Sequence, residues 1–274
     1  MTATVDPDVV AEENRLRRFL GVGGLSAIGF SNIVGSGWLF AAMYAAQIAG
    51  PAALLAWVAA GILVALVALV MVELGATRPE GGGTVRWPLY ASGRLVGSVI
   101  GFSVLLSVGA TSAELTAIVQ YAGYYLPWLY ADDALTGPGV VLAVLLSIVL
   151  TALNWFGVRL FGRLNTTITV VKVVIPVLTV VLLLASGFDG AHLTDHGGFA
   201  PYGYGAVLSA LAGGGIVYSL NGFQAPVDFS GEARNPRRTV PLAVLGSIGA
   251  ALLLYLGLQL AFLGAVPDAV LGAG

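Results

Sequence analysis

Two ionisable side chains lie in the middle of apolar stretches that are long enough to cross a membrane. Lys172, the only lysine of the chain, lies within the stretch at about 164–186, and Glu114 lies within the stretch at about 96–126. A charge at the centre of a membrane helix costs about 2.5–3.5 kcal/mol on insertion scales, so such residues generally pair or move protons and ligands. Because desolvation disfavours a charged side chain, we predict a proton-coupling role for Lys172 and Glu114. A structural ion pair between them is the alternative, and the two roles can coexist.

Glycines interrupt the first apolar stretch near its middle, in the segment Asn32-Ile33-Val34-Gly35-Ser36-Gly37. Each glycine weakens a helix by about 1 kcal/mol relative to alanine, so the segment is predicted to unwind. The freed amides of Gly35, Ser36 and Gly37 would lie at the positive end of the following half-helix, where they could bind a carboxylate. The Ile33 carbonyl would then accept a hydrogen bond from an ammonium group. The alternative interpretation is that the small residues only permit close helix packing.

The sixth apolar stretch is interrupted in the same way. Gly213-Gly214-Gly215 precedes a polar run at mid-membrane depth that contains Tyr218, Ser219, Asn221 and Gln224. Two interrupted helices five spans apart are typical of an inverted five-span repeat, in which a substrate binds where the broken helices meet. Tyr218 could instead be an interfacial aromatic residue, but its central position favours a binding site.

The elements that must position these residues are membrane-spanning helices. Apolar residues make up 58% of the 274 residues and charged residues only 9%, against about 25% charged in a soluble domain. Seven apolar stretches approach or exceed the roughly 20 residues that a helix needs to cross the hydrocarbon core. They lie at about 22–47, 52–77, 96–126, 140–156, 164–186, 204–229 and 240–266. The sequence therefore predicts an all-α, polytopic membrane protein with seven transmembrane helices.

Arginines indicate the orientation of these helices. Eleven of the 12 basic residues are arginines, and they fall before the first stretch or in every second connector: Arg15, Arg17, Arg18, Arg78, Arg86, Arg94, Arg159, Arg163, Arg234, Arg237 and Arg238. The remaining connectors hold Asp132, Asp133, Asp189, Asp195 and both histidines. Because basic residues favour the cytoplasmic side, we predict a multi-pass inner-membrane protein with its N-terminus in the cytoplasm. Asp228, near an arginine-bearing end, is expected to cap or anchor a helix.

Composition argues against several other functions. The chain has no cysteine and two histidines, and it has no basic run interleaved with aromatic residues, so neither a metal, a cofactor nor a nucleic acid is predicted. An enzyme is not expected, because no nucleophile and base are convincingly paired. A seven-span receptor or retinal protein is a further alternative. Such proteins generally have an external N-terminus and a retinal lysine in the last span, whereas Lys172 lies in the fifth.

Several ordered motifs carry a resemblance to a known family. They are Gly35-Ser36-Gly37, Glu73-Leu74-Gly75-Ala76, Pro79-Glu80-Gly81-Gly82, Gly222-Phe223 and Glu232-Ala233-Arg234-Asn235-Pro236. From about Gly21 to Pro241 the chain resembles the amino acid/polyamine/organocation (APC) permeases. Its Gly35–Phe40 and Gln47–Pro51 segments are most similar to the aspartate-proton symporter group.

The resemblance implies the N-terminal part of a five-plus-five inverted-repeat (LeuT-like) transporter fold, with spans 1 and 6 broken and the substrate between them. The substrate carboxylate would bind Ser36 and Gly37, and its ammonium would bind carbonyl or side-chain groups of Ile33, Tyr218 and Asn221. The residues that would face the substrate side chain are Asn32 and Gln224. Lys172 matches a span 5 lysine that replaces a sodium ion in proton-coupled relatives. Gln224 stands where some relatives have an acidic residue, which argues against a cationic substrate.

We therefore expect proton-coupled secondary transport of an amino acid by alternating access, with the substrate, protons and the lipid bilayer as partners. The expected division is a cytoplasmic N-terminal segment (1–21), a first five-span repeat (22–186), an extracellular loop (187–203) and the truncated start of the second repeat (204–274). The family generally has further spans after the seventh. An inert half-transporter, or one that depends on missing C-terminal spans or a second chain, is the alternative.

Overall fold

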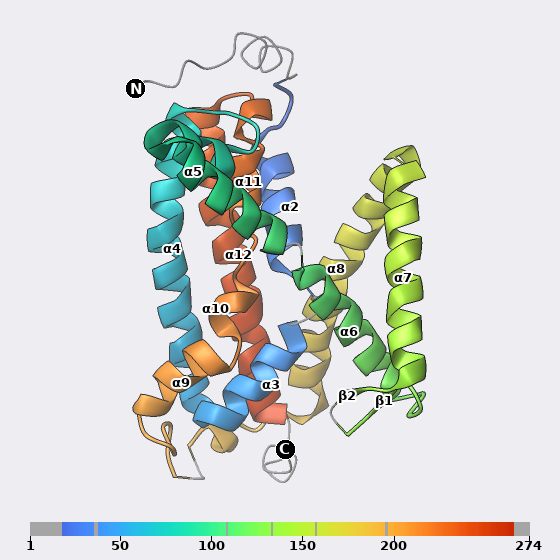
Figure 1. The fold of residues 1–274 in the computed structure, drawn as a ribbon. Helices are drawn as coiled ribbons and strands as arrows, with labels where there is room; N and C mark the ends of the chain where they lie inside the picture. The colour runs from blue at the N-terminus through green and yellow to red at the C-terminus, as the bar shows by residue number, and fades with distance from the viewer. Residues whose placement is uncertain are drawn as a thin grey trace. The chain divides into compact units, whose positions relative to one another are not determined.

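The computed structural model describes residues 18–35, 38–107, 109–132, 134–156, 158–194 and 197–265, and most of these residues are helical (Figure 1). The predicted predominance of helix is confirmed. Within these ranges the only sheet is one antiparallel pair of two-residue strands, β1 (Tyr130–Ala131) and β2 (Ala134–Leu135). This pair was not predicted, because two residues per strand leave no readable period of two in a sequence.

The helices follow one another with short connectors. The N-terminal half forms α2 (Val22–Ile33), α3 (Trp38–Ala49), the 3-10 helix η1 (Gly50–Ala52), α4 (Ala53–Thr77), α5 (Gly83–Ser107) and α6 (Ala110–Gly123). The C-terminal half forms α7 (Gly137–Phe156), α8 (Val158–Gly187), η2 (Gly190–Leu193), α9 (Gly205–Gly213), α10 (Ile216–Ser219), α11 (Ala225–Asp228), η3 (Ser230–Glu232) and α12 (Pro236–Ala265).

Four helical stretches are long and apolar enough to cross a membrane, judged among the described residues: Phe40–Thr77, Gly83–Gly123, Val170–Gly187 and Pro236–Ala265. Two shorter apolar helices, Val22–Ile33 and Gly137–Leu153, accompany them. The chain is thus a multi-pass membrane protein. The count of seven spans stays a prediction, because interruptions divide two of the expected stretches into pieces too short to cross alone.

The third apolar stretch differs from its prediction. Helix α5 begins at Gly83 rather than near residue 96, and it bends sharply at Gly93, whose φ of 82° lies outside the helical region. The helix then ends at Ser107, and α6 begins at Ala110. Because glycine is the residue that adopts positive φ without strain, Gly93 separates a short helix on the arginine-bearing side from the apolar helix that follows.

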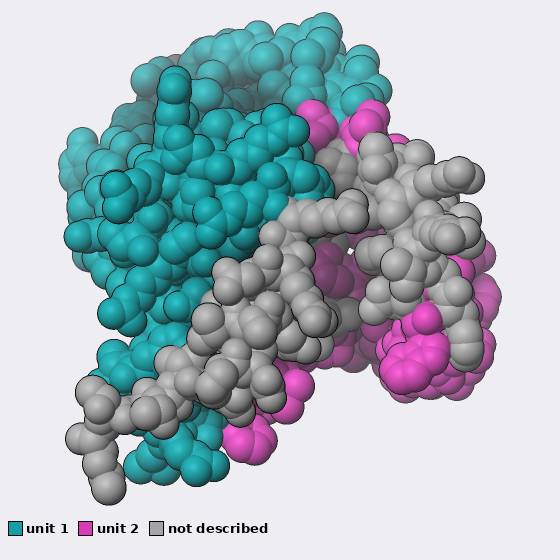
Figure 2. Space-filling model, turned by 90° about the horizontal axis from the view of Figure 1, so that it is seen from above, with its two compact units in different colours: residues 1–100, 174–274 teal, residues 101–173 magenta. Residues whose placement is uncertain are grey.

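The chain divides into two compact units, which Figure 2 shows in separate colours. Unit 1 comprises Met1–Ile100 and Val174–Gly274, and unit 2 comprises Gly101–Val173. Both interrupted stretches lie in unit 1, whereas Glu114 and Lys172 lie in unit 2. The predicted division into two repeats follows sequence order rather than contacts, and it stays a prediction.

Unit 1 is packed through small residues. Helix α12 packs against α4 and α2, and α3 packs against α9 (Figure 1). A Cβ added at Gly61 of α4 would lie 2.5 Å from a methyl of Leu252, and one added at Gly29 of α2 would lie 2.6 Å from Ser247 Oγ. Lipid tails are as apolar as the side chains, so the hydrophobic effect does not drive helices together inside a membrane. Close packing at small residues stabilises the helix contacts instead. Packing is thus the role of these glycines, and it leaves the interrupted segments to be explained separately.

Candidate binding site at two interrupted helices

Both predicted interruptions are present in the structure. Helix α2 ends at Ile33, Val34 has extended φ and ψ of −81° and 93°, and α3 begins at Trp38. In the sixth stretch α9 ends at Gly213, and the one-turn helices α10 and α11 replace a continuous helix. Gly215 and Gly222 have φ of 73° and 106°. These two residues supply the left-handed conformations that a broken helix needs and that other residues adopt only with strain.

The two interruptions touch through their backbones. A Cβ added at Gly222 would lie 2.6 Å from both the carbonyl carbon and the oxygen of Asn32, and 2.9 Å from the amide nitrogen of Ile33. No side chain fits at that separation. Glycine at this position therefore serves two purposes, the positive φ and the direct contact between the sixth and first stretches.

A third helix reaches both interruptions with one hydroxyl group. Tyr255 on α12 has its Oη 3.1 Å from the carbonyl oxygen of Ile33 and 3.2 Å from that of Ser219. Only 1% of Tyr255 is exposed. A continuous helix would satisfy these carbonyls with amides four residues later, so each interruption leaves a carbonyl to be bonded by another group. Tyr255 bonds both carbonyls, beside the Gly35 amide that also donates to Ile33 O, and its single proton can serve either oxygen.

A buried polar pair holds the ring of Tyr255. The Trp57 ring on α4 lies against it with a centroid separation of 4.9 Å and an interplanar angle of 36°. Trp57 Nε1 donates to Gln259 Oε1 at 2.9 Å, and both side chains are fully buried. The Gln259 amide nitrogen has no hydrogen-bond partner among the described residues. Aromatic packing and the hydrogen bond together fix the direction in which Tyr255 points.

The predicted residues of the first interruption are described in part. Gly35 donates its amide to Ile33 O at 3.1 Å, so that carbonyl accepts from Gly35 and from Tyr255. Asn32 donates its side-chain amide to Ile28 O at 3.1 Å and is exposed. Ser36 and Gly37, the predicted carboxylate ligands, lie outside the described residues. Their role stays a prediction.

The polar residues of the second interruption hold its shape. Gln224 Oε1 accepts from the Gly222 amide at 3.0 Å, while Gln224 Nε2 donates to Asn221 Oδ1 at 3.1 Å. Ser219 Oγ donates to Gly215 O at 2.9 Å. The bond from Gln224 satisfies the Gly222 amide, which a continuous helix would pair with a backbone carbonyl. They do not test whether the same side chains also contact a substrate.

Tyr218 and Asn221 face a cavity of about 550 Å³ rather than Asn32. The residues that share this cavity are mostly apolar and come from α4, α9 and the second interruption: Leu63, Val64, Val67, Ala212, Val217 and Phe223. Tyr218 is 59% exposed. The structure thus brings together Ile33 with Ser219, Asn32 with Gly222, and Tyr218 with Asn221, as three separate contacts.

Glu114 and Lys172 are half-buried residues of unit 2, and their coupling role stays a prediction.

Asp228 caps a helix, as expected from its position. Its Oδ1 accepts from Thr84 Oγ1 at 2.6 Å and from the Thr84 amide at 3.2 Å, in the first turn of α5. Its carbonyl accepts from the Gly82 amide at 3.0 Å. A carboxylate that bonds amides at a helix N-terminus also interacts favourably with the helix dipole. The end of the second interrupted stretch is thereby tied to the connector between α4 and α5.

Three residues of this arrangement were missed from sequence: Trp57, Tyr255 and Gln259. Their signal was present, because a glutamine and two amphipathic aromatic residues within apolar stretches can be recognised from the sequence. A prediction based on ionisable groups does not include them, because none of the three is ionised in a membrane. Within the described residues no group of three or more acidic residues or histidines could hold a metal ion.

Comparison with known proteins decides the family. A model of the amino acid permease family matches residues 20–274, which include both interruptions and every helix described above. The chain belongs to the amino acid permease family. The expected membership of the APC superfamily is thereby confirmed.

Relatives of this permease-family chain include several named amino acid transporters. It is 40% identical over 262 residues to the glutamate/serine transporter AimA of Bacillus subtilis, covering 92% of this chain and 48% of the relative. It is 33% identical over 268 residues to the aspartate-proton symporter of Bacillus subtilis, covering 97% and 51%. It is 30% identical over 260 residues to the human cationic amino acid transporter 4, covering 87% and 39%. The chain spans about half the length, or less, of these relatives.

Proposed function

We propose that this chain takes part in proton-coupled secondary transport of an amino acid across the cytoplasmic membrane, by alternating access. The contact between the two interrupted helices, held by the hydroxyl of Tyr255, carries this proposal. Interrupted helices present unpaired amides and carbonyls inside a membrane, where an amino acid needs partners for its carboxylate and its ammonium. The names of the relatives supply the substrate class, since they include glutamate/serine and aspartate-proton transporters.

The proposed roles follow the chemistry of each group. The substrate carboxylate binds Ser36 and Gly37, and its ammonium binds carbonyl or side-chain groups of Ile33, Tyr218 and Asn221. Asn32 and Gln224 face the substrate side chain. Lys172 and Glu114 exchange the coupled proton. The N-terminus lies in the cytoplasm in this proposal, because the arginines favour that side.

Uptake by reconstituted protein tests the proposal. The chain is incorporated into liposomes with an inward proton gradient, and entry of labelled glutamate, serine and aspartate is measured against protein-free liposomes. Uptake that collapses when a protonophore dissipates the gradient is the expected result. Uptake that is the same with and without the proton gradient would contradict the proton coupling.

A partner-dependent transporter is the second candidate, and the observation that favours it is the coverage of only about half of the curated relatives. In that case liposomes with this chain alone show no uptake, and co-expression with a chain that covers the remaining half of these relatives restores it. The substrate arrangement proposed above applies to either candidate, because both interruptions lie in this chain.

A further inference from the structure

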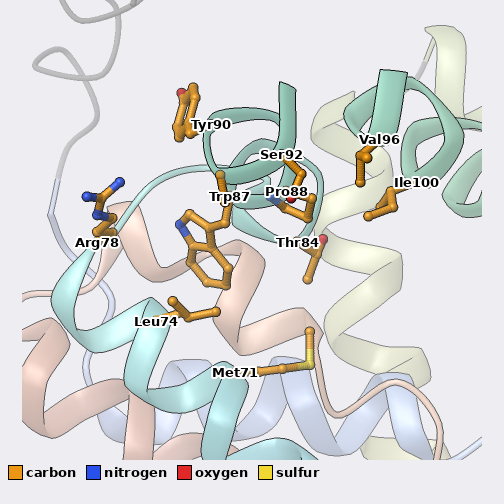
Figure 3. Close-up of a pocket in the computed structure, with 11 residues that line it drawn as sticks. Met71, Leu74, Arg78, Thr84, Trp87, Pro88, Tyr90, Ser92, Val96 and Ile100 are labelled. Carbon is orange, nitrogen blue, oxygen red and sulfur yellow. The ribbon is translucent and has the colours of Figure 1, made fainter. Parts of the chain in front are cut away.

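A cavity of about 780 Å³ lies between the end of α4 and the first part of α5, on the side of unit 1 that carries the arginines (Figure 3). Its wall has an apolar part and a polar part. Met71 and Leu74 of α4, with Val96 and Ile100 of α5, form the apolar part, and all four belong to helical stretches that can cross a membrane. Arg78, Thr84, Tyr90 and Ser92 contribute the polar part.

Arg78 is the only charged residue among the eleven described residues that line this cavity. Its side chain is exposed at the first residue after α4. No carboxylate belongs to the described lining, so the wall itself does not neutralise the guanidinium. Arginine binds phosphate and carboxylate groups through paired, charge-assisted hydrogen bonds. The polar part of the wall, around Arg78, is therefore suited to an anion.

Trp87 provides a second, independent observation at the same place. Only 7% of this residue is exposed, and its indole N–H has no hydrogen-bond partner among the described residues. A Cβ at Gly83 would overlap the indole ring, and one at Gly75 would lie 3.7 Å from it, so the two glycines make the space in which the ring is held. Figure 3 shows the indole nitrogen on the side of Arg78. A buried N–H without an acceptor is unfavourable, so an acceptor from outside the described residues is expected there.

A small soluble anion would contact only the polar part of this cavity. An anionic phospholipid would contact both parts, because its phosphate accepts hydrogen bonds while its acyl chain needs an apolar wall at membrane depth. Basic pockets between membrane helices, near the surface that carries the positive charges, are suited to such headgroups. We propose that this cavity binds an anionic phospholipid, with the phosphate at Arg78 and the Trp87 indole N–H and an acyl chain between α4 and α5.

The bound lipid would stabilise the connector that Asp228 also holds. Gly82 and Thr84 bond Asp228, and Thr84 also lines the cavity. The lipid site is nevertheless separate from the interrupted helices, and it does not depend on which substrate is transported. Its test can therefore use binding alone.

Lipid retention measured by native mass spectrometry tests this site. The chain is purified from its membrane, stripped of lipid, and equilibrated with equal amounts of phosphatidylglycerol and phosphatidylcholine. We expect preferential retention of phosphatidylglycerol, reduced about fivefold in Arg78→Ala, which corresponds to the loss of one basic residue near an anionic lipid. The control is Arg94→Ala, which removes an exposed arginine of α5 outside the cavity lining, and it should retain the lipid like the unchanged chain.

A second variant separates the cavity from surface charge. Ala91→Trp places a bulky ring in the lining without changing a charge, and it should reduce phosphatidylglycerol retention while Arg78 is intact. Helix content by circular dichroism identifies variants that fail to fold. Equal retention of the two lipids, equal losses in Arg78→Ala and Arg94→Ala, full retention in a folded Ala91→Trp, or displacement of the lipid by millimolar inorganic phosphate would each overturn the proposal.

Discussion

The hydroxyl of Tyr255 lies 3.1 Å from the carbonyl oxygen of Ile33, so a side chain of α12 is bonded to the backbone where the first helix ends. The same hydroxyl lies 3.2 Å from Ser219 O in the second interruption. A single group thus restrains two segments that are more than 180 residues apart in the sequence. Its removal affects both segments at once.

Replacing Tyr255 by phenylalanine should lower substrate uptake strongly while changing the stability of the protein little. The hydroxyl contributes about 1 kcal/mol through its hydrogen bond, but the two carbonyls lose their common partner. Uptake in liposomes and thermal unfolding in detergent measure the two effects. Tyr204→Phe, which removes the hydroxyl of an exposed tyrosine, is the control. Equal uptake by the two variants would show that the bridge has no part in transport.

Gly222→Ala should disrupt the contact between the interruptions. The new methyl group would meet the Asn32 carbonyl, and the residue would keep a φ near 106° only with strain. We expect loss of uptake, with reduced yield of folded protein. Gly249→Ala is the matched control, because nothing lies within 4 Å of its added Cβ and its helix can only gain stability. A Gly222→Ala variant that transports normally would mean that the two segments separate without cost.

The pair of Trp57 and Gln259 should show strong coupling in a double-mutant cycle. Trp57→Phe leaves the fully buried Gln259 amide without its donor, which costs about 1–3 kcal/mol. Adding Gln259→Leu removes the unpaired side-chain amide, so the double variant should recover part of the lost stability. Free energies of unfolding in mixed micelles provide the measurement. If the two single effects simply add, the hydrogen bond is not formed in the membrane.

The cap between Asp228 and Thr84 is expected to contribute to the stability of unit 1. Hydrogen bonds to a charged group are worth about 1.5–3 kcal/mol, so Asp228→Ala should lower the unfolding free energy by that order. Thr84→Ala should remove one of the two bonds and leave the amide bond in place. Glu73→Ala, at an exposed acidic residue of α4, serves for comparison. Similar losses in Asp228→Ala and Glu73→Ala would indicate a general charge effect and not a cap.

Lys172→Ala should abolish uptake driven by a proton gradient while some substrate exchange remains. The reason is the proposed proton exchange at this lysine, since exchange of substrate for substrate needs no net proton movement. Val174→Ala, at an exposed residue two positions along the same helix, is the control. Uptake by Lys172→Ala that still depends on the pH gradient would refute the coupling role.

The sequence predicted the positions of both interruptions because glycine acts locally on the helix. Gly35, Gly215 and Gly222 could be recognised without knowledge of their neighbours. The position of Asp228 at an arginine-bearing end predicted that it caps or anchors a helix, but not which helix it caps. What the sequence could not indicate was pairing at long range, such as Tyr255 with Ile33 or Trp57 with Gln259. Apolar stretches that are hydrophobic on all sides carry no period to show which face meets which helix.

The start of α5 also escaped prediction, and for a related reason. The segment from Gly83 to Ser92 is mixed in polarity and contains Pro88, so its composition resembles a connector. Its first turn is stabilised by Asp228, which lies 144 residues later. Capping from a distant segment leaves no local signal, because the usual N-cap residue is the neighbour of the helix it caps.

The groups that join the two interrupted helices are main-chain atoms: the carbonyls of Ile33 and Ser219, and the backbone of Asn32 where it meets Gly222. Every amino acid supplies the same main chain. Side chains of these segments that take no part in this contact, or in the bonds of Ser219, Asn221 and Gln224, can therefore vary without weakening it, provided that Tyr255 and Gly222 are retained. The contact between the two interrupted helices can thus stay the same while the side chains around it change.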